Sequence, residues 1–144
     1  MGTLELQAGL RMNVQVVSMW YNEEFLAPLF LNHYSFADRI HIFLDLDTSD
    51  DTEKICSKFD NICIHPFSFP DMMDDQIKVD TINNFVSTID CDWVINVDAD
   101  EFIFPIPVHD PKRILARQNK SNLMYAQLWQ VYRNVLDKKN NIPT

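Results

Sequence analysis

The sequence predicts an α/β fold in which a mostly parallel sheet is flanked by helices. From residue 14 to residue 100, short β-rich runs alternate with segments whose apolar residues recur at helical spacing. Such alternation is typical of parallel strands joined by right-handed crossovers. The 144 residues, 47% of them hydrophobic, are enough for one domain with a sizeable core.

Five segments are predicted strands. Residues 14–19 and 39–44 are β-rich runs, and residues 62–67 form a third short run that a proline ends. Residues 93–100 are expected to form the buried central strand, because apolar residues dominate most of this segment. A last strand is predicted over residues 123–131, after a break at two prolines.

Helices are predicted between these strands, over residues 25–34, 51–59 and 74–88. Pro28 is compatible with the first helix only near its first turn, where a proline breaks no helical hydrogen bond. Residues 111–118 begin with a proline in a favourable position, and they predict a fourth helix.

The polar residues before the first two helices have two interpretations. Asn22 or a neighbour can cap the first helix, and Thr48, Ser49 and Asp50 can each cap the second. Capping is the stronger explanation for that second group. For Asn22 and Glu23 a role facing a ligand is equally open, because open α/β sheets bind ligands at the carboxyl ends of their strands.

Residues 93–104 organise the chain, since an apolar run ends in three carboxylates and then resumes. If this segment is extended, Asn96, Asp98 and Asp100 form a polar row on one face. Two carboxylates so placed repel each other unless a charge offsets them, and a hard divalent cation with phosphate ligands does so. The alternative is an acidic, solvated turn, in which Asp is also common.

Composition argues against several other functions. The formal charge of -9 disfavours wide contact with nucleic acid or anionic lipid. With only two glycines there is no glycine-rich phosphate loop, and the four histidines lack the HExxH spacing of metalloproteases. Three cysteines without CxxC spacing predict reduced thiols and a cytoplasmic location, and no apolar run is long enough for a membrane span.

Three motifs occur in order after the predicted strands. They are Asn-Glu-Glu at residues 22–24, Asp45 with Thr-x-Asp-x-Thr at residues 48–52, and Asp-Ala-Asp-Glu-Phe at residues 98–102. This ordered set resembles the family 2-like glycosyltransferases, in particular the branch with an Asn-Glu-Glu start and an Asp-Ala-Asp-Glu-Phe core. The resemblance covers residues 14–104.

The resemblance implies a glycosyltransferase A-type fold with a Rossmann-like sheet, and a nucleotide-sugar donor held with Mn²⁺ or Mg²⁺. It implies that Asp45 contacts the nucleotide base and that Asn22 and Glu23 line the nucleotide pocket. Asp98 and Asp100 would form the metal-binding DxD motif. Asp100 is favoured as the direct metal ligand, and Asp98 would serve the ribose or the metal.

The implied activity is sugar transfer to a glycan or lipid-linked acceptor in polysaccharide or glycoconjugate biosynthesis. The cation would neutralise the departing diphosphate, and an inverting enzyme also needs a general base. In related enzymes that base lies in the acceptor half, so we expect it beyond Thr144; Glu101 is not nominated, because in a strand it faces away. Residues 1–12 are then a leader or disordered start, and residues 13–144 an incomplete, C-terminally truncated nucleotide-sugar-binding domain.

Two other functions stay open. A catalytically silent nucleotide-binding or scaffold fragment is consistent with a missing acceptor half. A nucleotidyltransferase also uses strand-end aspartates and a metal, but the first strand here lacks the glycine-rich, basic loop of that class. A truncated sheet would also expose an apolar edge, which predicts self-association.

Overall fold

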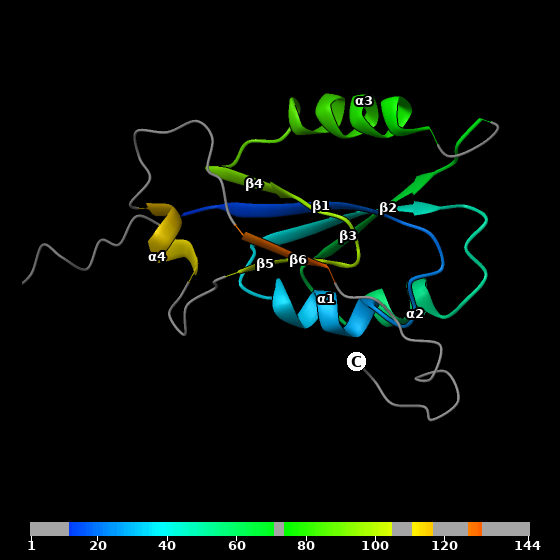
Figure 1. The fold of residues 1–144 in the computed structure, drawn as a ribbon, viewed down its shortest axis with the longest axis horizontal. Helices are drawn as coiled ribbons and strands as arrows, with labels where there is room; N and C mark the ends of the chain where they lie inside the picture. Colours follow the sequence, from blue (N-terminus) through cyan, green and yellow to red (C-terminus); the bar gives the residue numbers. More distant parts are fainter. Residues whose placement is uncertain (1–11, 71–73, 105–110, 117–126, 131–144) are drawn as a thin grey trace, which may run out of the picture.

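The structure is a computed structural model that describes residues 12–70, 74–104, 111–116 and 127–130. Four strands form one sheet, and all their pairings are parallel. These strands are β1 (Val14–Trp20), β2 (Arg39–Asp45), β3 (Ile62–Phe67) and β4 (Trp93–Asn96). Their order is β3-β2-β1-β4, which confirms the predicted α/β fold with a mostly parallel sheet (Figure 1).

Helices cover both faces of this sheet (Figure 1). The helices α1 (Ala27–His33) and α2 (Thr52–Cys56) pack on one face, and α3 (Asp75–Val86) packs on the other. Each is shorter than predicted at one or both ends. The prediction for Pro28 is confirmed, because this residue lies in the first turn of α1. No helix in the described ranges has the length and apolarity needed to cross a membrane.

The main core lies between the sheet and the helices α1 and α2. Trp20 and Phe30 are nearly inaccessible to solvent. Their rings pack edge to face, with the ring centroids 5.1 Å apart. Tyr34 lies in the same cluster, and its hydroxyl donates to the Glu101 carbonyl and accepts from Ile103 N. These two bonds attach the strand β5 (Glu101–Phe104) to α1. β5 pairs with β6 (Gln127–Gln130) in an antiparallel ribbon.

The prediction of a central strand over residues 93–100 is wrong. β4 ends at Asn96 and lies at an edge of the four-stranded sheet, next to β1. Residues 98–101 form a turn instead, in which Glu101 N donates to the Asp98 carbonyl at 3.0 Å and Asp98 N donates to the Glu101 carboxylate at 2.9 Å. The backbone N–H groups of Asp98 and Glu101 thus find their acceptors within the turn. The chain is not extended here, so the polar row that an extended strand would create does not form.

Three other predictions concern segments that the structure describes only in part. The last predicted strand, over residues 123–131, appears as β6 where it is described, and its other residues lie outside those ranges. The helix predicted over residues 111–118 appears as α4 (Pro111–Ala116). The leader predicted over residues 1–12 lies outside them except for its last residue.

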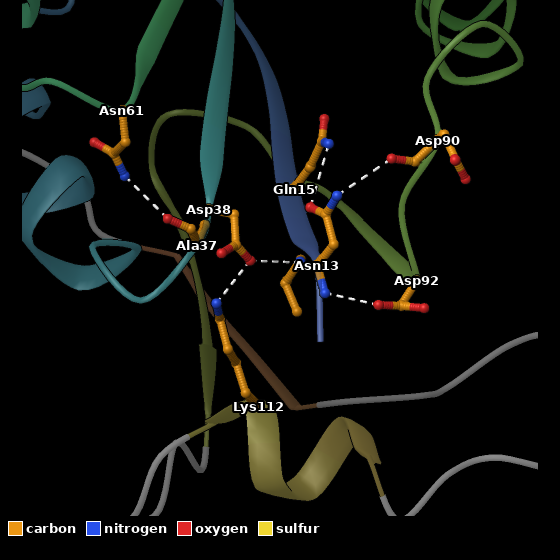
Figure 2. Close-up of polar contacts among 9 residues, drawn as sticks. Asn13, Gln15, Ala37, Asp38, Asn61, Asp90, Asp92 and Lys112 are labelled. Atoms are coloured by element: carbon orange, nitrogen blue, oxygen red, sulfur yellow. Dashed lines mark hydrogen bonds and ion pairs between the residues drawn. The ribbon is translucent and has the colours of Figure 1, made fainter. Parts of the chain in front are cut away.

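A polar network fixes the amino end of the sheet (Figure 2). The Asp38 carboxylate accepts from Val14 N at 2.9 Å and from the Lys112 ammonium of α4 at 2.6 Å. Asn13 N donates to the Asp92 carboxylate at 2.7 Å. Residues before β2 and β4 thus hold the start of β1. These bonds help to fix the register in which β1 pairs with β2 and β4.

A histidine pair, of which His41 is buried and His65 is half-buried, extends this network under α3. His41 Nε2 lies 2.8 Å from Gln15 Oε1, and His41 Nδ1 lies 3.0 Å from His65 Nε2. Burial lowers the pKa of His41 to about 4, with further contributions from His65 and Arg39, and burial also lowers the pKa of His65. The fold therefore holds both imidazoles in their neutral form at neutral pH.

This pair predicts a loss of stability in mild acid. The folded-state pKa of His41 is below its ordinary value of 6.5, so the unfolded chain binds more protons between pH 6.5 and pH 4. We expect the free energy of unfolding to fall by about 1–2 kcal/mol between pH 7 and pH 5 through His41. Urea unfolding of His41→Gln at both pH values should show a smaller fall than wild type. Equal falls would contradict the assignment.

Candidate functional site at the carboxyl ends of the strands

The predicted site residues lie where the strands end, along the carboxyl edge of the sheet that the ends of β1, β2 and β4 form. β1 lies between β2 and β4 with parallel pairings, so the segments that follow these three strands leave the sheet side by side. Asn22 and Glu23 follow β1, Asp45 ends β2, and Asp98 and Asp100 follow β4. The predicted placement of Asn22, Glu23 and Asp45 at strand ends is confirmed, whereas Asp98 and Asp100 lie in the turn after β4 and not in the strand itself.

Hydrogen bonds join the segment after β1 to the segment after β2. Asn22 Oδ1 accepts from Ser49 N at 2.8 Å, and Glu23 N donates to the buried Thr52 hydroxyl at 2.8 Å. Asn22 has a φ of 53°, the one positive value at a non-glycine residue in the described ranges. Asn tolerates this conformation better than most residues. Of the two interpretations of Asn22, capping does not apply, because Leu26 is the N-cap of α1 and makes no side-chain cap bond.

Asp50 is the centre of the same contact. One carboxylate oxygen accepts from Glu24 N at 3.0 Å, while the other accepts from Thr52 N at 3.0 Å and from the Thr52 hydroxyl at 2.5 Å. Burial alone would raise the pKa of Asp50, but hydrogen bonds from Thr52 and Glu24 outweigh it and lower the pKa. The predicted capping by Asp50 is partly confirmed: it binds the first residue of α2, although Asp51 is the N-cap.

Asp45 has a local role. One of its carboxylate oxygens accepts from Asp47 N at 2.8 Å, and its carbonyl accepts from Thr48 N at 3.0 Å. These bonds bend the chain as it leaves β2 and fix the direction of the Asp45 side chain. The contact of Asp45 with a nucleotide base stays a prediction.

The turn over residues 98–101 has a counter-charge that the motifs did not reveal. The Lys78 ammonium, from α3, forms an ion pair with Asp98 Oδ1. A signal for this residue was present, since Lys78 lies four positions before the buried Ile82 and therefore on the core-facing side of the helix. From such a position a lysine packs its aliphatic chain along apolar surface and brings its ammonium group out to the rim, where it can meet a carboxylate.

The carboxylates of this edge affect one another. The pKa of Glu23 is raised to about 7, first because the side chain is partly buried and then because Asp100, Asp50 and Asp98 lie nearby. Three segments that are far apart in the sequence therefore contribute negative charge to one place. A cation at this position would be favoured electrostatically.

The donor set suits a hard divalent cation that completes its shell with other ligands. In the described part of the chain, no three His, Cys, Asp or Glu side chains are arranged to hold a metal ion. Asp98 and Asp100 can provide two carboxylates, and Mg²⁺ is commonly bound by one or two carboxylates together with waters and substrate phosphates. The residues present fit a cation that binds with a phosphate ligand better than one that binds alone.

The contact through Asn22 predicts a graded loss of stability. Asn22→Gly removes the bond to Ser49 but tolerates the positive φ, whereas Asn22→Ala removes the bond and also strains the backbone. We expect losses of about 1 kcal/mol for glycine and about 2 kcal/mol for alanine in urea unfolding. Asn32→Ala, an exposed change on α1, is the control. An alanine variant as stable as wild type would contradict this role.

The comparisons with known proteins leave the family open. No model of a known protein family matches the chain, and no curated protein has a similar sequence.

Proposed function

We propose that this chain binds a nucleotide-sugar donor together with Mn²⁺ or Mg²⁺, as the donor-binding part of a glycosyltransferase. The proposed acceptor is a glycan or a lipid-linked molecule. The observation that carries the proposal is the convergence of three acidic segments, after β1, β2 and β4, at the carboxyl edge of a parallel sheet. This edge is where open α/β sheets bind their ligands.

The charge of the edge explains why a cation is needed. Asp100, Asp50 and Asp98 already disfavour one further negative charge, since they raise the pKa of Glu23. A diphosphate would meet the same repulsion, and the chain has no glycine-rich loop to bind it through backbone amides. A divalent cation supplies the positive charge that holds the diphosphate and stabilises it as a leaving group.

The contacts support different roles for the two aspartates of the turn. Asp98 is oriented by its ion pair with Lys78, and its backbone N–H is held by the Glu101 carboxylate. Asp100 is the member of the pair that we assign as the direct metal ligand, and we assign Asp98 to the ribose or the metal. Because Glu101 stabilises the turn, we do not nominate it as a general base.

Asn22, Glu23 and Asp45 form the nucleotide side of the proposed site. Asn22 holds the segment after β2 through Ser49, so we assign it a positioning role in the pocket wall. Glu23 lies near Asp100, Asp50 and Asp98, and we assign it to the part of the pocket beside the diphosphate. The second carboxylate oxygen of Asp45 is proposed to accept a hydrogen bond from the base, since the first is used by Asp47 N.

Calorimetry with UDP, GDP, CDP and dTDP tests this proposal. We expect one nucleotide to bind in the presence of Mn²⁺ and its affinity to fall more than about tenfold with EDTA, because the acidic edge then repels the diphosphate. Asp100→Asn should cause a similar loss. Asp90→Asn, an exposed change at the other end of the sheet, should bind like wild type.

The outcomes separate the proposed function from its rivals. Binding that needs neither Mn²⁺ nor Asp100, or no binding by a folded sample, would contradict the donor site. Metal-dependent binding without hydrolysis or transfer of any nucleotide sugar would favour a catalytically silent binding protein. Release of pyrophosphate from a nucleoside triphosphate and a sugar phosphate would instead indicate a nucleotidyltransferase.

A further inference from the structure

The ion pair between Lys78 and Asp98 connects a helix to the turn of the proposed metal site. The start of α3 is fixed by Asp74, whose carboxylate accepts from Gln76 N at 2.8 Å and Ile77 N at 3.3 Å. Lys78 follows in the first turn, and its own N–H donates to the Asp74 carbonyl at 3.0 Å. The capped helix end fixes the backbone from which the Lys78 side chain reaches Asp98 in the turn.

The ammonium and a divalent cation would compete for the same carboxylate. Lys78 and Asp98 are in direct contact, so a cation on Asp98 would lie within a few ångströms of the ammonium. Two positive charges at such a distance repel each other strongly when they are partly removed from water. A lysine fixed in this position would weaken the binding of the cation, and a lysine that can leave would not.

We propose that Lys78 is an internal counter-ion: it neutralises Asp98 while the site holds no divalent cation, and the cation binds by displacing the ammonium. This inference rests on the proposed function, since it concerns the same metal site. It makes Lys78 a positioning residue that acts through Asp98. It also couples occupancy of the site to the contact between α3 and the turn.

The exposure of the pair permits this exchange. The Lys78 side chain is 24% exposed and the Asp98 side chain is 46% exposed. Water reaches about half of the Asp98 side chain, so the ion pair is partly screened and a cation has access to the carboxylate. The bond between Glu101 and Asp98 N does not involve the Asp98 side chain, so the turn keeps its shape when the ammonium leaves.

A Mn²⁺ titration followed by NMR tests the competition directly. Paramagnetic broadening of the backbone amides of residues 98–101 reports binding of the metal alone, even when it is weak. We expect Lys78→Met to lower the half-saturating Mn²⁺ concentration about fivefold, which corresponds to the removal of one competing surface ion pair. Lys78→Arg, which keeps the charge, should stay close to wild type.

Lys54→Met is the matched control for net charge. Lys54 forms an exposed ion pair with Asp51 in the segment after β2, at 3.4 Å, so the variant removes the same charge without touching Asp98. A long-range effect of charge would change both methionine variants alike. The inference requires a clearly larger effect for Lys78→Met than for Lys54→Met.

A second measurement uses the unmodified protein. The ¹⁵Nζ signal of Lys78 should move towards that of an unpaired lysine when Mg²⁺ is added, and it should not move in Asp100→Asn. Two outcomes would overturn the inference and leave the metal site intact. One is a Lys78 signal that stays unchanged at saturating Mg²⁺. The other is equal Mn²⁺ affinity of the Lys78→Met and Lys54→Met variants. Absence of Mn²⁺ broadening at the turn in every variant would also overturn this inference, whereas the donor site itself stands or falls with the Mn²⁺-dependent binding of a nucleotide.

Discussion

The contact between the segments after β1 and β2 is the constraint on which the rest of the site depends. Backbone amides of one segment meet side-chain acceptors of the other in both directions, through the pairs Asn22–Ser49, Glu24–Asp50 and Asp51–Glu24. These bonds satisfy polar backbone groups that would otherwise need water. They also keep several carboxylates close together at the carboxyl edge of the sheet, at an electrostatic cost.

That cost is visible at Glu23, whose pKa of about 7 reflects burial and the neighbouring aspartates. The fold keeps this unfavourable charge instead of replacing it with apolar contacts. Among Glu23 and the three aspartates that raise its pKa, Asp98 is the one with an ammonium partner in the described contacts. Functional sites commonly hold titratable groups in such perturbed environments. A cation-dependent ligand would relieve the repulsion, which connects the electrostatics of the edge to the proposed donor binding.

Much of the fold could be predicted from the sequence, because periodicity and turn residues act locally. The runs at residues 14–19, 39–44 and 62–67 became β1, β2 and β3 with small changes at their ends. The fourth run failed as a central strand for one local and one tertiary reason. The preference of Asp98 for a turn, closed by Glu101, outweighed continued pairing with β1, and the strand order placed β4 at an edge.

The sequence by itself determined the alternation of strands and helices, the acidic character of the strand ends and the positions of Asp45, Asp98 and Asp100 along the chain. Only the tertiary structure decided which of these groups meet. The parallel order of the sheet placed the segment after β1 between two others, and the direction of α3 brought Lys78 to Asp98. Such contacts join residues about twenty or more positions apart, and local periodicity contains no information on them.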